Sequence, residues 1–181
     1  QAYFTDSLKA PLMMLERAKP YFLVALLYPR MMNCPSPAGV EEELLKIAKQ
    51  DKKEIKGLET MLFQVEVFDS IPYERQEKKL LMNINSFSVY KKEYDDMLKL
   101  YKDQQLDSMQ NMVGASEFGS EKYEDLLLNN RNKKWVNELN GIMKNESVFV
   151  AVGAGHLTGQ YGLINLLKKE GYKVEPLENI K

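Results

Sequence analysis

Apolar residues recur at helical spacing through most of the chain. Leucine, methionine and aromatic residues three or four positions apart predict two short helices between residues 5 and 30, interrupted by Pro20, and another helix over 41–49. Between residues 60 and 145 nearly every segment follows the same period, apart from a break at the glycines and serines of 114–119. This middle part is therefore expected to be a large helical insertion.

Three short segments instead have the pattern of β-strands. The continuous apolar run 147–152 is the most marked, and 53–59 and 173–177 are shorter candidates. A glycine-rich turn and a helix over 161–169, capped by Gly171, join the last two segments into a β-turn-α-β unit. The expected fold class is α/β, with a partial, mostly parallel sheet, the large helical insertion and this closing unit.

The number of predicted strands is small for such a fold. Sheets usually contain about five or six strands, whereas three are expected here. We therefore expect residues 1–181 to form a single but incomplete domain. Residue 1 is Gln rather than Met, which fits the loss of a preceding segment and leaves localisation unreadable from this chain.

Charge and hydropathy exclude two classes of partner. The formal charge of -1 comes from 25 basic and 26 acidic residues that are mixed along the chain. Without a basic stripe to neutralise phosphates, nucleic acid is not expected as a partner. The longest nearly unbroken apolar run, 21–28, is far shorter than the roughly 20 residues of a membrane-spanning helix, so no transmembrane segment is expected.

Two titratable residues follow predicted strands at the end where ligands bind in open α/β sheets. These are Glu59 and His156, the only histidine. His156 ends the sequence Gly153-Ala-Gly155-His, whose glycines allow a sharp turn and a close approach of the backbone to a ligand. The imidazole is therefore a candidate metal ligand or acid/base group. A histidine that caps the next helix or bonds a backbone carbonyl fits the spacing equally well.

Helical spacing also singles out Arg131. It lies four residues before Trp135 on a predicted apolar stripe, where a buried guanidinium must find an anion or several carbonyl groups. The alternative is an arginine that reaches solvent and pairs with Glu124 or Glu138. Glu59 also has a structural alternative, because a glutamate at the start of a helix interacts favourably with the first-turn amides.

Several of these segments together resemble one protein family. The segment 150–159, Val-Ala-Val-Gly-Ala-Gly-His-Leu-Thr-Gly, with Gly-Tyr-Lys-Val-Glu-Pro at 171–176, is similar to the closing motif of the TraB/GumN family. Gly-Leu-Glu-Thr at 57–60 and Arg131-Asn132 match further parts of the family pattern in the same order. The resemblance extends over nearly the whole chain, and the family is related to the Tiki metalloproteases.

The resemblance implies a divalent-metal hydrolase that cleaves peptide bonds, with Zn, Mn or Co as plausible ions. Its site is built from two Gly-x-x-His motifs, glutamates and an arginine, but the first Gly-x-x-His and its glutamate have no match here. The missing N-terminal segment of the same domain is thus expected as a partner, beside a peptide or protein substrate. A secreted, periplasmic or envelope location follows by analogy. The implied roles are metal ligands (His156, Glu59), catalytic residues (Glu59, Arg131) and loop-shaping residues (Gly153, Gly155, Asn132).

Two other functions remain open at this stage. The first is a non-catalytic regulatory protein of the same fold that binds a peptide or signal, because ten methionines and ten tyrosines suit an adaptable surface. The second is a domain whose motif residues serve packing alone. Measurements of metal binding and peptide binding distinguish these two functions from each other and from the hydrolase.

Overall fold

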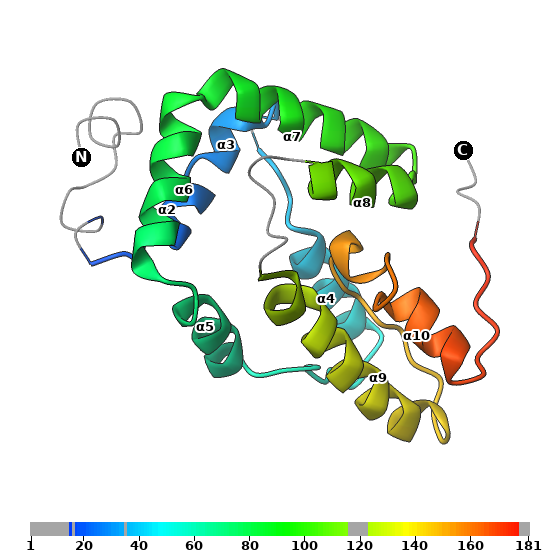
Figure 1. Cartoon of the computed structure of the whole chain (residues 1–181). Coiled ribbons are helices and arrows are strands. Elements are labelled where there is room, and N and C mark those ends of the chain that lie inside the picture. The colour runs from blue at the N-terminus through cyan, green and yellow to red at the C-terminus, as the bar shows by residue number, and fades with distance from the viewer. Residues whose placement is uncertain (1–14, 16, 35, 116–122, 178–181) are drawn as a thin grey trace. The chain divides into compact units, whose positions relative to one another are not determined.

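A computed structural model describes residues 15, 17–34, 36–115 and 123–177. Within these ranges the regular secondary structure consists of helices, and no strand is present (Figure 1). The expected α/β fold with a partial parallel sheet is therefore wrong for the described part of the chain, which is all-α.

The error lies in the three predicted strands. Segments 53–59, 147–152 and 173–177 are irregular, and no backbone ladder joins them to described residues. A β-strand is stable only when a neighbouring strand satisfies its backbone groups, so an apolar run can favour this conformation without forming it. Phe149, in the most apolar of the three, leaves 82% of its surface exposed.

The chain divides into two compact units, Gln1–Tyr94 and Asp95–Lys181. Unit 1 contains the helices α2 (Pro20–Ala25), α3 (Tyr28–Met31), α4 (Val40–Gln50), α5 (Met61–Asp69) and α6 (Tyr73–Asn85), and α7 (Phe87–Lys102) begins in it. Pro20 is the first residue of α2, a position where the missing N–H has no intrahelical partner to lose, so it begins a helix instead of interrupting one. Most of the helix expected before Pro20 lies outside the described residues.

Helix α2 packs against α6 in unit 1 (Figure 1). Polar contacts connect both helices to the end of α5. The Gln76 side chain on α6 is 3% exposed and donates from Nε2 to the carbonyl oxygens of Ile71 at 2.9 Å and Phe68 at 3.3 Å. Its Oε1 accepts from the backbone N–H of Tyr21 at 3.4 Å. Lys19, just before α2, forms an ion pair with Asp69.

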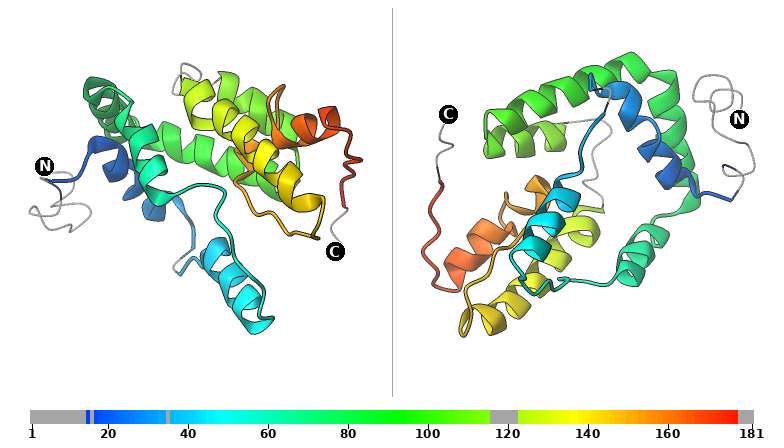
Figure 2. Two further views of the ribbon diagram at one scale, coloured as in Figure 1. Left: turned by 90° about the horizontal axis from the view of Figure 1, so that it is seen from below. Right: turned by 180° about the vertical axis from the view of Figure 1, so that it is seen from behind.

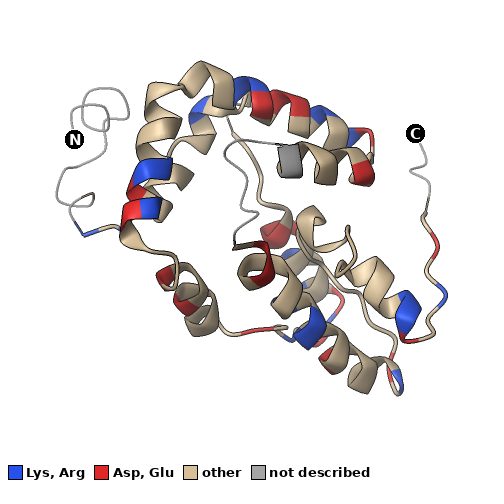
Figure 3. Cartoon of the chain, in the orientation of Figure 1, with Lys and Arg blue, Asp and Glu red and all other residues tan. Residues whose placement is uncertain are grey.

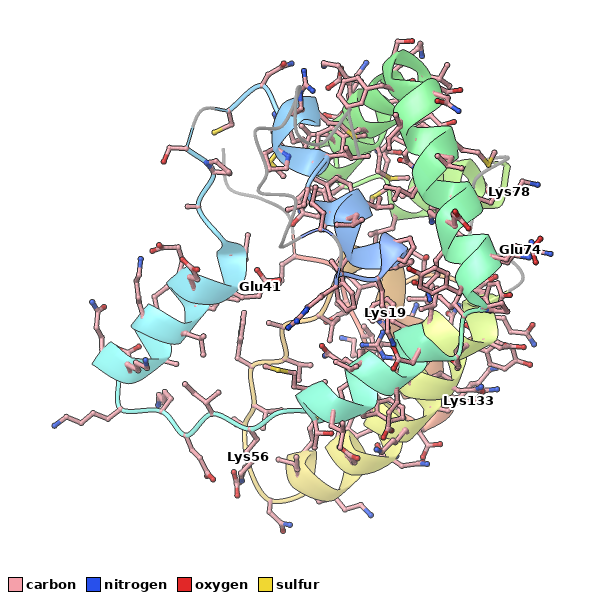
Figure 4. All side chains as sticks on the ribbon, turned by 90° about the vertical axis from the view of Figure 1, so that its left-hand side faces the viewer. Lys19, Glu41, Lys56, Glu74, Lys78 and Lys133 are labelled. Atoms are coloured by element: carbon pink, nitrogen blue, oxygen red, sulfur yellow. The ribbon has the colours of Figure 1, made fainter. Side chains whose placement is uncertain are left out.

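Surface charges in the helices are mixed, as expected from the sequence. Lysine and acidic residues follow one another along α7 (Figure 3). Figure 4 shows Glu74 and Lys78 on the same side of α6, one helical turn apart.

The predicted helix over 41–49 is confirmed as α4, whose first turn carries three glutamates that interact favourably with the helix dipole. No helix among the described residues is long and apolar enough to span a membrane.

Unit 2 holds the closing part of the chain. Its elements are the rest of α7, α8 (Leu106–Ala115), the π-helical turn η3 (Asp125–Asn129), α9 (Asn130–Met143), the 3₁₀ turn η4 (Ala154–His156) and α10 (Leu163–Lys169). The expected helix break falls where α8 ends, although residues 116–122 are outside the described part. Both views in Figure 2 show α9 and α10 side by side, in agreement with their contacts.

Helix α9 turns a narrow face into the core of unit 2. Asn132, Trp135, Val136 and Leu139 are all buried at the i, i+3, i+4, i+7 spacing of one helical stripe, and Leu163 of α10 is buried as well. Arg131 lies half-buried at the edge of this face. The position of Asn132 is unusual, because a polar amide occupies the first place in an otherwise apolar stripe and must find partners there.

The cap predicted at the end of the last helix is confirmed. Gly171 has φ +91° and follows α10; its N–H bonds the carbonyl of Lys168, and the N–H of Tyr172 bonds that of Leu167. This is the Schellman arrangement, which requires a left-handed residue and so favours glycine. The helix itself begins at Leu163 rather than Tyr161, because Gly162 is its N-cap.

Candidate functional site

The only histidine lies at the end of a single 3₁₀ turn in unit 2. The backbone N–H of His156 bonds the carbonyl of Gly153 at 2.9 Å, and that of Leu157 bonds Ala154 at 3.0 Å. The side chain is 8% exposed, so a polar ring is held almost wholly inside the unit. A buried imidazole needs hydrogen-bond partners, and α9 supplies one.

Asn132 contacts His156 through both its side chain and its backbone. Asn132 Oδ1 lies 2.6 Å from His156 Nδ1, and Asn132 Nδ2 donates to the carbonyl oxygen of His156 at 3.2 Å. The same Nδ2 donates to the carbonyl of Tyr161 at 2.8 Å. One amide, itself 1% exposed, therefore holds the start and the end of the turn between 156 and 161.

An aromatic and a cationic side chain lie beside this pair. The rings of Trp135 and His156 are 4.4 Å apart between centroids with an interplanar angle of 40°, and the Arg131 guanidinium carbon lies 4.9 Å from the Trp135 ring centroid. Arg131 Nη1 donates to the carbonyl of Leu127 at 2.8 Å, one turn back along the chain. Helix α9 thus brings Arg131, Asn132 and Trp135 to the same region as the imidazole.

The glycines of the closing turn have different structural roles. A Cβ at Gly162 would lie 2.1 Å from the carbonyl oxygen of Thr158 and 2.5 Å from that of Leu157, and Gly159 has φ +85°. A Cβ at Gly155 would meet nothing within 4 Å, and at Gly153 only a carbon of the His156 ring at 3.9 Å. The sharp turn therefore requires glycine at 159 and 162. At 153 and 155 the backbone would accept alanine, so the turn itself does not require glycine at these two positions.

Glu59 belongs to unit 1 and is described there alone. It is half-buried, directly before Thr60, and its Oε1 accepts from Gln64 Nε2 at 3.0 Å. Thr60 Oγ1, not the glutamate, caps α5 by accepting from the N–H of Phe63 at 3.2 Å. The N-cap of α5 is therefore Thr60.

The donors for a metal ion are incomplete in the part of the chain that the structure describes. No group of three or more His, Cys, Asp or Glu residues comes together there. Catalytic zinc sites typically take three protein ligands and structural sites four, whereas unit 2 provides one positioned imidazole. The described residues by themselves therefore do not fit a complete divalent-metal site.

Comparison with known proteins identifies the family. The model of the TraB/PrgY/gumN family matches residues 1–176, nearly the full length of the chain. The chain belongs to the TraB/PrgY/gumN family. No curated protein and no solved structure matches it.

The geometry groups only some of the residues that the sequence predicted for this TraB/PrgY/gumN domain. Arg131, Asn132 and His156 lie together in unit 2, with Gly153 and Gly155 in the turn that leads to the histidine. Trp135 lies with them; the sequence placed it on the apolar stripe and, with Arg131-Asn132, in the family pattern, but did not predict it as a site residue. The signal that could have identified it is its place, three residues after the one buried asparagine of α9.

Proposed function

We propose that this TraB/PrgY/gumN domain contributes to a metal-dependent hydrolase that acts on peptide bonds. The observation that carries the proposal is the hydrogen bond between Asn132 and the buried ring of His156. Histidines that bind metal ions usually have the other ring nitrogen held by a hydrogen-bond acceptor, which orients the ring. An imidazole oriented in this way suits a ligand role.

Each residue has a distinct part in this proposal. His156 would serve as a ligand for a divalent ion, which supplies an activated water in hydrolases of this kind. Arg131 carries a permanent positive charge close to the imidazole region and would stabilise negative charge on the substrate. The role of Glu59 as a further ligand or general base stays a prediction of the sequence, because this residue belongs to unit 1. Because the described residues bring together a single donor, the ion also needs ligands beyond them.

The deciding experiment measures Zn²⁺, Mn²⁺ and Co²⁺ binding to the longest natural form of the protein. Ion content after reloading and dialysis is compared between the wild type, His156→Ala and Glu59→Gln, with Glu54→Gln as an exposed glutamate control. The proposal expects near-stoichiometric ion in the wild type and the control, and loss in His156→Ala. Equal ion content in the wild type and His156→Ala would remove the histidine from the metal site.

Cleavage is tested separately from binding. A broad peptide library is incubated with the metal-loaded protein, and products are identified by mass spectrometry. Metal-stimulated cleavage that disappears in His156→Ala and in Arg131→Met would support hydrolysis. A protein that binds metal but leaves every peptide intact would contradict it.

A second function is favoured by the same incomplete donor set. A non-catalytic protein that binds a peptide or signal needs no metal, and the irregular segment around Phe149 exposes apolar side chains suited to contact with another polypeptide. Peptide binding measured by fluorescence anisotropy distinguishes the two. Binding that survives chelator and His156→Ala, without cleavage, would favour this function over hydrolysis.

A further inference from the structure

The orientation of the Asn132 amide follows from its surroundings. Its Nδ2 faces two backbone carbonyl oxygens, of His156 and Tyr161, and such oxygens can only accept hydrogen bonds. If the amide were flipped, its own oxygen would face both carbonyls and lose two hydrogen bonds inside the unit. The nitrogen therefore points to the carbonyls, and Oδ1 is the atom 2.6 Å from His156 Nδ1.

An amide oxygen cannot donate, so the proton of this contact must be on the ring. His156 Nδ1–H donates to Asn132 Oδ1, and in the neutral imidazole the lone pair is then on Nε2. Free histidine in water prefers the opposite form, with the proton on Nε2. The protein environment thus reverses the usual preference of the ring.

We infer that Asn132 is a positioning residue that holds neutral His156 as the Nδ1–H tautomer and so leaves the lone pair of the ring on Nε2. The inference deepens the proposed function and rests on it for the role of Nε2, whereas the tautomer itself does not depend on a metal. The contact of Asn132 with the His156 carbonyl fixes the backbone, and the packing of Trp135 on the ring restricts its rotation. Together these contacts set both the place of the ring and the nitrogen that carries the lone pair.

The test uses the fact that the chain has one histidine. Long-range ¹H–¹⁵N correlation spectra of the ¹⁵N-labelled full chain then contain a single imidazole spin system. Well above the usual titration range of imidazole, we expect a protonated-type ¹⁵N shift at Nδ1 and a lone-pair-type shift at Nε2. A wild-type ring with the proton on Nε2, or with both forms in fast exchange, would overturn the inference without any variant.

Three variants test whether Asn132 is the cause. Asn132→Leu should move the ring toward the Nε2–H form, and Asn132→Asp should keep the Nδ1–H form because a carboxylate oxygen also accepts. Asn140→Leu changes an asparagine on the same helix that bonds Glu170, and should leave the imidazole shifts as in the wild type. A folded Asn132→Leu protein that retains the Nδ1–H form would contradict the role of Asn132. If that variant does not fold, the Asp variant tests the same contact, and an Asn132→Asp protein with the proton on Nε2 would contradict the need for an acceptor at position 132.

Zn²⁺ titration connects the tautomer to function. In the wild type, added Zn²⁺ should shift Nε2 strongly, and removing the supporting hydrogen bond in Asn132→Leu should weaken the affinity by about 10- to 100-fold. Asn132→Asp should keep most of the Zn²⁺ affinity. Zn²⁺ bound through Nδ1 would overturn the inference. An Nδ1–H ring that ignores Zn²⁺ would instead support the positioning role and contradict the proposed metal site, so the two failures are distinguishable.

Discussion

Each unit contains a buried side-chain amide that donates to two backbone carbonyl groups, yet the two amide oxygens accept from different partners. In unit 1, Gln76 Oε1 accepts from the backbone N–H of Tyr21. In unit 2, Asn132 Oδ1 accepts from the ring of His156. A ring pair accompanies each amide, Tyr21 with Phe68 at 4.7 Å and Trp135 with His156 at 4.4 Å.

The two networks differ in the kind of group that their hydrogen bonds reach. All three partners of Gln76 are backbone groups, so its hydrogen bonds join α2, α5 and α6 and end there. The bonds of Asn132 do the same for the closing turn, but one of them ends on a titratable side chain whose state can change. The same amide chemistry thus stabilises backbone in one unit and orients a titratable side chain in the other.

The largest effect is expected when either amide is replaced by leucine. Gln76→Leu and Asn132→Leu each leave one buried and one partly buried carbonyl without their donor. Because unsatisfied buried groups each cost about 1–3 kcal/mol, each variant should lose about 3 kcal/mol of unfolding free energy. Urea denaturation measures both.

Only one of these two variants should affect the imidazole. The ¹⁵N shifts of His156 should change in Asn132→Leu and stay unchanged in Gln76→Leu, although the loss of stability is similar. Altered His156 shifts in the Gln76 variant would show that the imidazole responds to any loss of stability. The two amides would then not differ in their effect on the ring.

A second prediction concerns the glycines of the closing turn. Gly162→Ala should lower the unfolding free energy by about 2 kcal/mol or more, because its Cβ would overlap two backbone carbonyl groups that cannot move away easily. Gly155→Ala should change stability by less than about 0.5 kcal/mol, since its Cβ meets open space. Thermal denaturation compares the two.

The Gly155→Ala variant also tests whether ligand binding requires glycine at this position. If Gly155→Ala weakens Zn²⁺ or peptide binding while stability is unchanged, the glycine serves ligand approach. Unchanged binding in that variant would show that ligand approach does not require glycine at position 155.

The third prediction compares the ring pairs. Phe68→Leu in unit 1 and Trp135→Phe in unit 2 should each cost about 1 kcal/mol of unfolding free energy through lost ring contacts. The indole N–H of Trp135 has no hydrogen-bond partner among the described residues, so the phenylalanine leaves no polar group unsatisfied. Only Trp135→Phe should increase the mobility of the imidazole, measured as line broadening of the His156 ring signals. Equal broadening in Phe68→Leu would contradict the separation of the two networks.

The smallest expected effect is a pH dependence in unit 1. Burial lowers the pKa of Lys79 below its ordinary 10.5, because desolvation disfavours the charged ammonium. The unfolded chain then binds more protons just below pH 10.5, so the Lys79 contribution to unfolding free energy rises with pH through that window. Lys79→Met should remove this rise and be more stable than the wild type at neutral pH.

Two tyrosines in unit 1 change the unfolding free energy with pH in the opposite direction. Burial raises the pKa of Tyr21 and Tyr28 above 10.0, so their contribution is complete below that pH and is lost as pH rises through the folded-state values. The quantity to compare is therefore the difference in unfolding free energy between the wild type and Lys79→Met at each pH, measured by urea denaturation. A difference that does not change between pH 8 and 10.5 would contradict the assignment to Lys79.

Local patterns predicted the helices well and the strands badly. The helix over 41–49 and the cap at Gly171 depend on periodicity, charge at the first turn and a left-handed glycine, all of which are local. The run 147–152 has the composition of a strand, but strands require partners at a distance in the chain. Sequence spacing also identified His156 and Arg131 as candidates. It could not show that Asn132, rather than either of them, is the most deeply buried polar residue of the group.

The sequence by itself determined which residues are candidates for chemistry, one histidine and an arginine on a helical stripe, and its closing motif was specific enough to indicate the TraB/PrgY/gumN family. Tertiary structure decided how they are related. Positions 132 and 156 are 24 residues apart, and nothing in their local spacing brings an amide to an imidazole. Only the packing of α9 against the closing turn does so, because hydrogen bonds act over about 3 Å in space regardless of distance along the chain.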